Sequence, residues 1–149
     1  MKKISVIMFV LLLIVLLGSC DTRKELSNQE ISDLIENVQQ SLTGDYVYID
    51  KESGLYYNSQ DNVEQTEQNQ QAEQKKRAVL NMLNRVDVDS ITGYEVCTKI
   101  TNFLQFSCEL DNEPYNACVD FYKDGKIIIT LDEKSNPANG FEIIMGEDS

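Results

Sequence analysis

The chain has 149 residues, of which 42% are hydrophobic, and its 25 acidic side chains outnumber the 13 basic ones to give a net charge of −12. A chain of this length builds one modest hydrophobic core, since domains typically run about 100 to 150 residues. The acidic balance argues against nucleic acid as a partner, because nucleic-acid binding relies on clustered Lys and Arg. The absence of His excludes the standard catalytic triads and the mixed Cys/His zinc sites.

The first 19 residues have the organisation of an export signal. Lys2 and Lys3 form a short positive region, and residues 4–17 are an uncharged, almost wholly apolar run of 14 residues. A bilayer-spanning helix needs about 20 such residues, whereas a run of this length is typical of the core of a signal peptide. We therefore expect residues 1–19 to be a signal peptide. The residues that follow decide whether it is the signal of a lipid-attached protein, and the alternatives are an ordinary cleaved signal or a short uncleaved anchor.

The segment that ends this run, Leu17-Gly18-Ser19-Cys20, resembles the lipobox of bacterial lipoproteins. The resemblance covers residues 1–20 and implies that Cys20 receives a diacylglyceryl group and becomes the first residue after cleavage. Each buried methylene contributes ~0.8 kcal/mol and two or more acyl chains hold stably, so acylated Cys20 is a durable membrane anchor. The implied location is the cell membrane, facing the periplasm or the exterior, and Asp21 resembles the inner-membrane retention signal of enteric-type bacteria.

The chain after the expected signal peptide is strongly acidic. Without Lys2 and Lys3, 11 basic and 25 acidic side chains remain, a net side-chain charge of −14. Anionic lipid surfaces repel such a domain, so membrane attachment depends on the acyl chains of Cys20. The main basic cluster is Lys75, Lys76 and Arg77, with Arg85 further along the same expected helix. We interpret it as a solvated helix face rather than a nucleic-acid site.

Two helices are expected after a polar tether at residues 20–26. Ser27 and Glu30 have the spacing of a capping box, and Gly44 is the expected stop of the helix. The polar, Gln/Asn-rich segment 58–74 cannot bury a core and is either a mobile loop or the solvated start of the second helix, which is clear from about Ala72. The first helix has an apolar stripe at helical intervals: Ile31, Leu34, Ile35, Val38 and Leu42.

The rest of the chain has the patterns of strands. Residues 46–49 and 55–57 are β-prone runs joined by a Gly-containing turn, which predicts a hairpin. From Ile91 the period becomes two, with strands expected near residues 93–100, 103–110, 115–122, 126–132 and 141–145. The prediction is a single α+β domain over residues 27–149, with two helices packed on an antiparallel β-meander. Small exported domains of the cystatin-like kind have a similar layout, and this analogy carries no activity.

Besides Cys20 the sequence has Cys97, Cys108 and Cys118, all in the expected strand region. Because disulfides persist in exported proteins, one disulfide and one leftover thiol are expected. Nearby strand positions favour Cys108 with Cys118, and Cys97 is the alternative partner of either. Register decides the pairing and cannot be fixed from sequence, so three buried reduced thiols are the other interpretation.

No motif predicts a cofactor, a metal ion or a catalytic set. The chain has no Cys-x-x-Cys and no glycine-rich phosphate loop, and its acidic clusters at residues 87–89 and 111–113 lack the order of an EF-hand. We therefore expect a non-enzymatic envelope lipoprotein that binds a protein or peptide, basic by complementarity, at an exposed sheet edge or at the hairpin 46–57. The alternatives are an immunity or exclusion-type protective lipoprotein and a small His-independent enzyme that uses carboxylates or a Cys.

Overall fold

The structure is a computed structural model that describes residues 23–61 and 67–146. The expected signal peptide, Cys20 and Asp21 lie outside the described residues. Within the described ranges, no helix is long and apolar enough to cross a bilayer.

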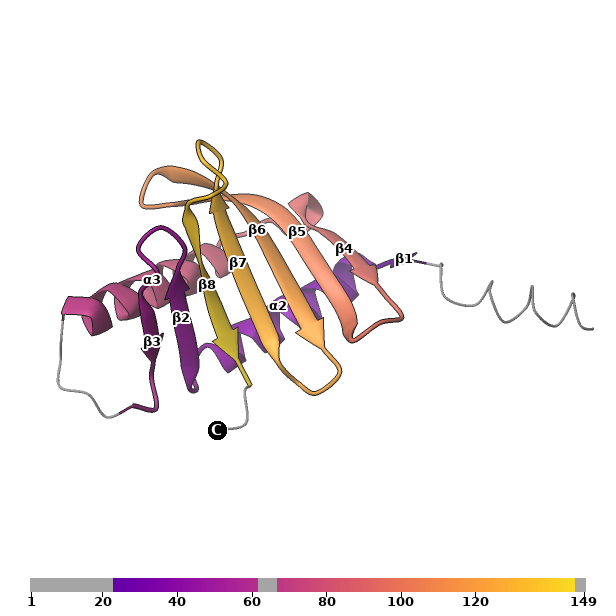
Figure 1. The fold of residues 1–149 in the computed structure, drawn as a ribbon. Helices are drawn as coiled ribbons and strands as arrows, with labels where there is room; N and C mark the ends of the chain where they lie inside the picture. Colours follow the sequence, from indigo (N-terminus) through magenta and orange to yellow (C-terminus); the bar gives the residue numbers. More distant parts are fainter. Residues whose placement is uncertain (1–22, 62–66, 147–149) are drawn as a thin grey trace, which may run out of the picture.

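The described residues form two layers, an eight-stranded antiparallel sheet and two helices that lie on one of its faces (Figure 1). This arrangement confirms the predicted α+β class. The elements, in chain order, are β1 (Lys24–Glu25), α2 (Asn28–Ser41), β2 (Tyr46–Asp50), β3 (Tyr56–Asn58), α3 (Glu67–Leu83), the short 3-10 helix η1 (Val88–Ser90), β4 (Thr92–Glu95), β5 (Ile100–Leu110), β6 (Glu113–Tyr122), β7 (Ile127–Glu133) and β8 (Gly140–Met145).

The strands follow the order β1-β4-β5-β6-β7-β8-β2-β3. Strands β4 to β8 form the predicted meander, and β2 with β3 forms the predicted hairpin. The hairpin adds to the meander at its last strand, because β2 pairs with β8 along residues 46–50. Two parts of the chain about 90 residues apart therefore complete one sheet, a long-range pairing that local patterns do not encode.

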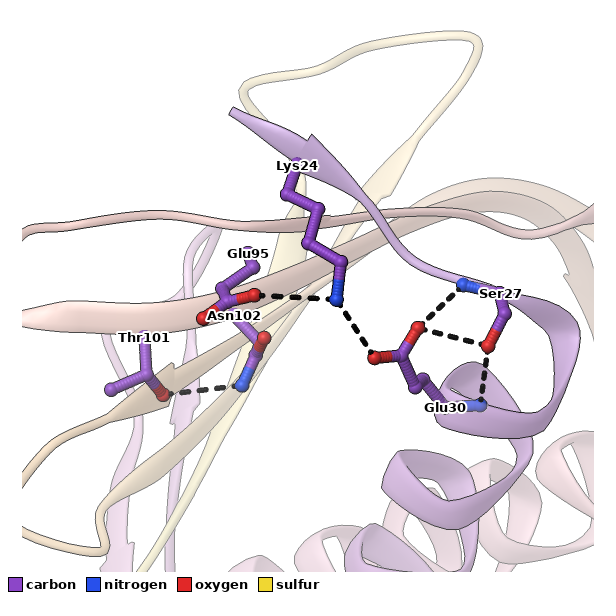
Figure 2. A network of polar contacts seen from close by, with 6 residues as sticks. All are labelled: Lys24, Ser27, Glu30, Glu95, Thr101 and Asn102. Atoms are coloured by element: carbon purple, nitrogen blue, oxygen red, sulfur yellow. Dashed lines mark hydrogen bonds and ion pairs between the residues drawn. The ribbon is translucent and has the colours of Figure 1, made fainter. Parts of the chain in front are cut away.

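Helix α2 begins as the sequence predicts. The Ser27 hydroxyl accepts from the Glu30 backbone N–H, and the Glu30 carboxylate accepts from the Ser27 N–H at 2.8 Å, so the capping box is confirmed. Figure 2 shows that Lys24 joins this cap to the sheet, with Nζ 3.2 Å from Glu30 Oε1 and 3.7 Å from Glu95 Oε2. Bonds from the Ser27 backbone and hydroxyl, and then from Lys24, lower the pKa of Glu30 to about 2.

The expected apolar stripe of α2 faces the sheet, and the helix ends at Ser41, before Gly44. Helix α3 begins at Glu67, so the second half of the polar segment is the start of a helix, one of the two alternatives expected. Its Lys75 and Lys76 are half-buried, with Nζ atoms 5.5 Å and 4.6 Å from the ring centroids of Phe141 and Tyr46. The interpretation of this basic cluster as a solvated helix face fits the exposed Arg77 and Arg85, whereas the long stems of these two lysines pack over aromatic rings.

The strand bounds differ from the expected ones near the start of the meander. β4 ends at Glu95 and β5 begins at Ile100, so Cys97 lies in the connecting loop and not in a strand. The β5–β6 connection is a two-residue turn, with Asp111 and Asn112 at φ 52° and 68°. This is the geometry of a tight hairpin turn, and it lets β6 begin two residues earlier than expected.

The core lies between the helices and one face of the sheet. Alternate residues of the long strands point into it, as the period of two predicts. Its largest fully buried side chains are Tyr48, Phe141, Leu42, Leu104, Ile129, Leu131, Ile143, Met145, Val38, Val79 and Val119.

Candidate binding surface

The second face of the sheet carries no helix in the described structure and is turned toward the viewer in Figure 1. In most two-layer α+β domains such a face is polar, because it contacts water. Here it is not uniformly polar. The cross-strand register aligns Tyr94 of β4, Phe103 of β5, Asp120 of β6, Ile128 of β7 and Ile144 of β8, each opposite the next. We call these five residues the central row.

The four apolar members of the central row are half-buried, and none belongs to the core cluster of the described residues. The rings of Tyr94 and Phe103 lie against each other, with centroids 5.3 Å apart. The row continues into β2 at Val47, which pairs with Ile144 and is only 6% exposed. The open face therefore has an aromatic pair on one side and an aliphatic cluster on the other.

Asp120 stands between these two apolar parts. Its carboxylate accepts one bond, from the Cys118 thiol, with Sγ 3.8 Å from Oδ1. Among the described residues, no Lys or Arg lies within ion-pair distance of this carboxylate. Burial raises the pKa of Asp120, and the Cys118 bond opposes this shift. The centre of the open face thus holds a partly desolvated negative charge without a cation.

Two other carboxylates of this face have a lysine beside them. Lys51 Nζ lies 2.6 Å from Asp132 Oδ1 and 3.9 Å from Glu142 Oε1. Within the described residues, Asp120 has no such partner and is half-buried, whereas Glu109, which also lacks an ion pair, is exposed on the same face.

The Phe103 ring already contacts a cation. The guanidinium of Arg23, the residue before β1, lies 5.9 Å from its centroid. Cations within about 6 Å of an aromatic face are attracted by the ring quadrupole. The aromatic side of the open face is therefore chemically suited to a positively charged group.

The structure separates the cysteines that the sequence groups together. Cys108 lies opposite Tyr115 of β6 and faces the helices. Cys118 lies three residues beyond Tyr115 on β6, opposite Gln105, and faces the open side of the sheet. Both thiols are free, and a disulfide does not fit this register, because three residues span about 10 Å and a disulfide joins Cα atoms at most about 7 Å apart. Cys97 is exposed, beyond the end of β5 that is opposite to Cys108.

A groove of about 390 Å³ lies between the C-terminal half of α3 and the β5–β6 hairpin. Arg85, Asp87 and Asp111 line it together with Met82 and Cys108. Burial raises the pKa of the Cys108 thiol to about 11, although Lys134 acts in the opposite direction. A thiol with this pKa is protonated at neutral pH, and the thiol form is a poor nucleophile.

The tyrosines of the hairpin have different roles. Tyr46 and Tyr48 are buried, and their hydroxyls donate to Glu73 Oε1 at 2.6 Å and to Asp50 Oδ2 at 3.3 Å. Tyr57 packs edge-on to Tyr46, with ring centroids 5.8 Å apart. Tyr56, on the edge strand β3, is 59% exposed. Packing within the domain explains Tyr46, Tyr48 and Tyr57. Tyr56 is therefore the tyrosine of the hairpin that a partner could contact.

Over residues 23–61 and 67–146, no group of three or more acidic or Cys side chains is arranged to hold a metal ion. Comparison of the chain with protein-family models, with curated proteins and with solved structures found no match. The fold and the surface define a two-layer α+β domain with an open, partly apolar sheet face. The similarity to cystatin-like layouts remains an analogy of architecture.

The sequence patterns predict the half-buried strands but not the central row as a site. A signal was present, because β7 and β8 contain the apolar pairs Ile127-Ile128 and Ile143-Ile144, which break the alternation expected of a strand with one wet face. The period of two expected for residues 115–122 places Asp120 outward, as β6 does. What the sequence lacks is the register that brings these residues into one row.

Proposed function

We propose that the chain is a lipid-anchored bacterial envelope lipoprotein, without enzymatic activity, whose domain binds a protein or peptide on the open face of its sheet. The observation that carries the binding role is the central row, an apolar strip with an uncompensated carboxylate at its centre. Partly apolar patches on a small soluble domain are typical of interaction sites. The strongly acidic chain would attract basic partners.

The anchor rests on the lipobox resemblance at residues 17–20 and on the apolar run before it. Acyl chains on Cys20 would hold the domain at the cell membrane, at the inner membrane if the retention rule for Asp21 applies. Intact mass of the protein from membranes tests this. We expect the mass of residues 20–149 plus acyl chains, and its loss in Cys20→Ala. An unmodified chain that starts elsewhere would refute the anchor.

Photo-crosslinking in intact cells tests the binding role. A photoreactive amino acid replaces Ile144 in the central row, and, as a matched control, the exposed Gln40 on α2 of the helical layer. We expect a discrete protein adduct from position 144 that survives moderate salt and is absent from position 40. The same adducts from both positions, or none, would contradict a binding role of the open face.

An enzymatic role is the weaker alternative. The groove beside α3 is concave and charged, but its thiol has a pKa raised to about 11, which disfavours thiolate chemistry. An immunity or exclusion role would be a form of the proposed one, with an incoming protein as the partner.

A further inference from the structure

We propose that the centre of the open face is a subsite for one cationic side chain, arginine or lysine, of the bound protein segment, with Asp120 as its counter-ion and the Phe103 ring beside it. This inference rests on the proposed function, because it names the chemistry that the partner brings to the same face.

The Asp120 carboxylate needs a cation once a partner covers the open face. A partner that covers the central row takes this carboxylate further from water, which is costly unless a cation pairs with it. No described Lys or Arg does so, and the single bond to its carboxylate comes from a thiol, which is a weak donor. An apolar or acidic partner would thus leave a buried unpaired charge, whereas a cationic side chain removes it.

Phe103 provides an aromatic ring next to the Asp120 carboxylate. It lies directly opposite Asp120 across β5 and β6, and such pairs have Cβ atoms about 4.5–5.5 Å apart. A guanidinium or ammonium above the ring is then within reach of the carboxylate. The Arg23 guanidinium lies 5.9 Å from the centroid of the same ring, so the ring accepts a cation in this fold. Arg23 is not within ion-pair distance of Asp120, which leaves the carboxylate to a cation of the partner.

Apolar side chains flank the subsite. Ile128 pairs with Asp120 on the other side, and Ile144 and Val47 follow it. From β4 to β2 the row crosses five strand spacings, about 24 Å, the length of roughly seven residues of extended chain. The matching ligand is therefore a short segment with apolar side chains around one arginine or lysine.

Two peptides test the subsite: acetyl-Val-Arg-Val-amide and its neutral isostere with citrulline in place of arginine. The full chain, purified from membranes in non-ionic detergent, is titrated with each by calorimetry and by carboxyl-carbon NMR of Asp120. We expect wild type to prefer the arginine peptide by about tenfold, the size of a charge-assisted bond. Asp120→Asn abolishes the preference, and Phe103→Leu reduces it about threefold.

Glu142→Gln is the matched control, because Glu142 lies on the same face but is already beside Lys51. This variant is expected to keep the preference. Equal binding of the two peptides to wild type, binding of neither, or equal loss in Glu142→Gln and Asp120→Asn would overturn the subsite. Adducts from position 144 would still support the proposed function in that case, while bound peptides without adducts would refute the function and leave the subsite standing.

Discussion

At the scale of single residues, Asp120 is a charge that the folded chain accommodates poorly. Its raised pKa means that the folded state binds a proton more tightly than the unfolded state, so its ionisation costs stability as the pH rises through the folded pKa. A charge that costs stability is expected where it serves binding.

We therefore predict that Asp120→Asn stabilises the domain at pH 7, by on the order of 1 kcal/mol. Urea unfolding followed by circular dichroism measures the difference. The gain should shrink toward about pH 3, where the wild-type carboxyl is largely protonated. A destabilised variant at pH 7 would mean that the carboxylate makes a favourable interaction within the domain.

The pKa of Glu30, in the capping box with Ser27, is shifted in the opposite direction to that of Asp120. The pKa of Glu30 is lowered from 4.5 to about 2, so its contribution to stability is present above about pH 4.5 and is lost as the pH falls toward 2. Ser27→Ala is expected to cost about 1 kcal/mol at pH 7. Glu30→Gln should flatten the acid limb of the stability curve, and an unchanged limb would assign the acid sensitivity to other carboxyls.

At the scale of elements, the join between β7 and β8 depends on one glycine. Gly140 has φ +140°, and a Cβ there would collide with the Leu131 backbone carbonyl of the neighbouring strand. Gly140→Ala is predicted to cost about 2 to 5 kcal/mol, from backbone strain and overpacking together. Gly54→Ala is the control, since its φ of +70° is strained but no atom lies within 4 Å, and about 1 kcal/mol is expected. Equal losses in thermal or urea unfolding would contradict this account.

The sequence predicts those elements whose pattern depends on residues close together in the chain. The cap at Ser27, the stripe of α2 and the alternation of β6 all follow from short-range chemistry and are confirmed. The sequence does not predict the start of α3 at Glu67 or the loop that holds Cys97. Polar helical turns and short strands have weak hydrophobic periodicity. The candidate site depends on register across six strands, which no local pattern contains.

At the scale of the whole molecule, the proposed anchor residue Cys20 and the sheet are close together in the chain. Only residues 21–23 separate Cys20 from β1, so the reach from Cys20 to Lys24 is at most about 14 Å. Strand β1 forms one edge of the sheet, and the opposite edge, β3, is seven strand spacings away, about 34 Å. If Cys20 is acylated as proposed, the β1–β4 edge faces the membrane, and the β3 edge is held away from it.

The chain has no Trp, so a single introduced Trp reports its own depth. We predict that Trp fluorescence of Glu95→Trp on β4 is strongly quenched by lipids spin-labelled at the headgroup, and that of Tyr56→Trp on β3 is not. Insertion of about 15 Gly/Ser residues after Asp21, with an r.m.s. length of roughly 20 Å, should remove the difference. Equal quenching without the insertion would contradict the orientation. A fixed edge at the bilayer would present the open face sideways to partners that lie in or beside the same membrane, whereas a freely rotating domain would have no such restriction.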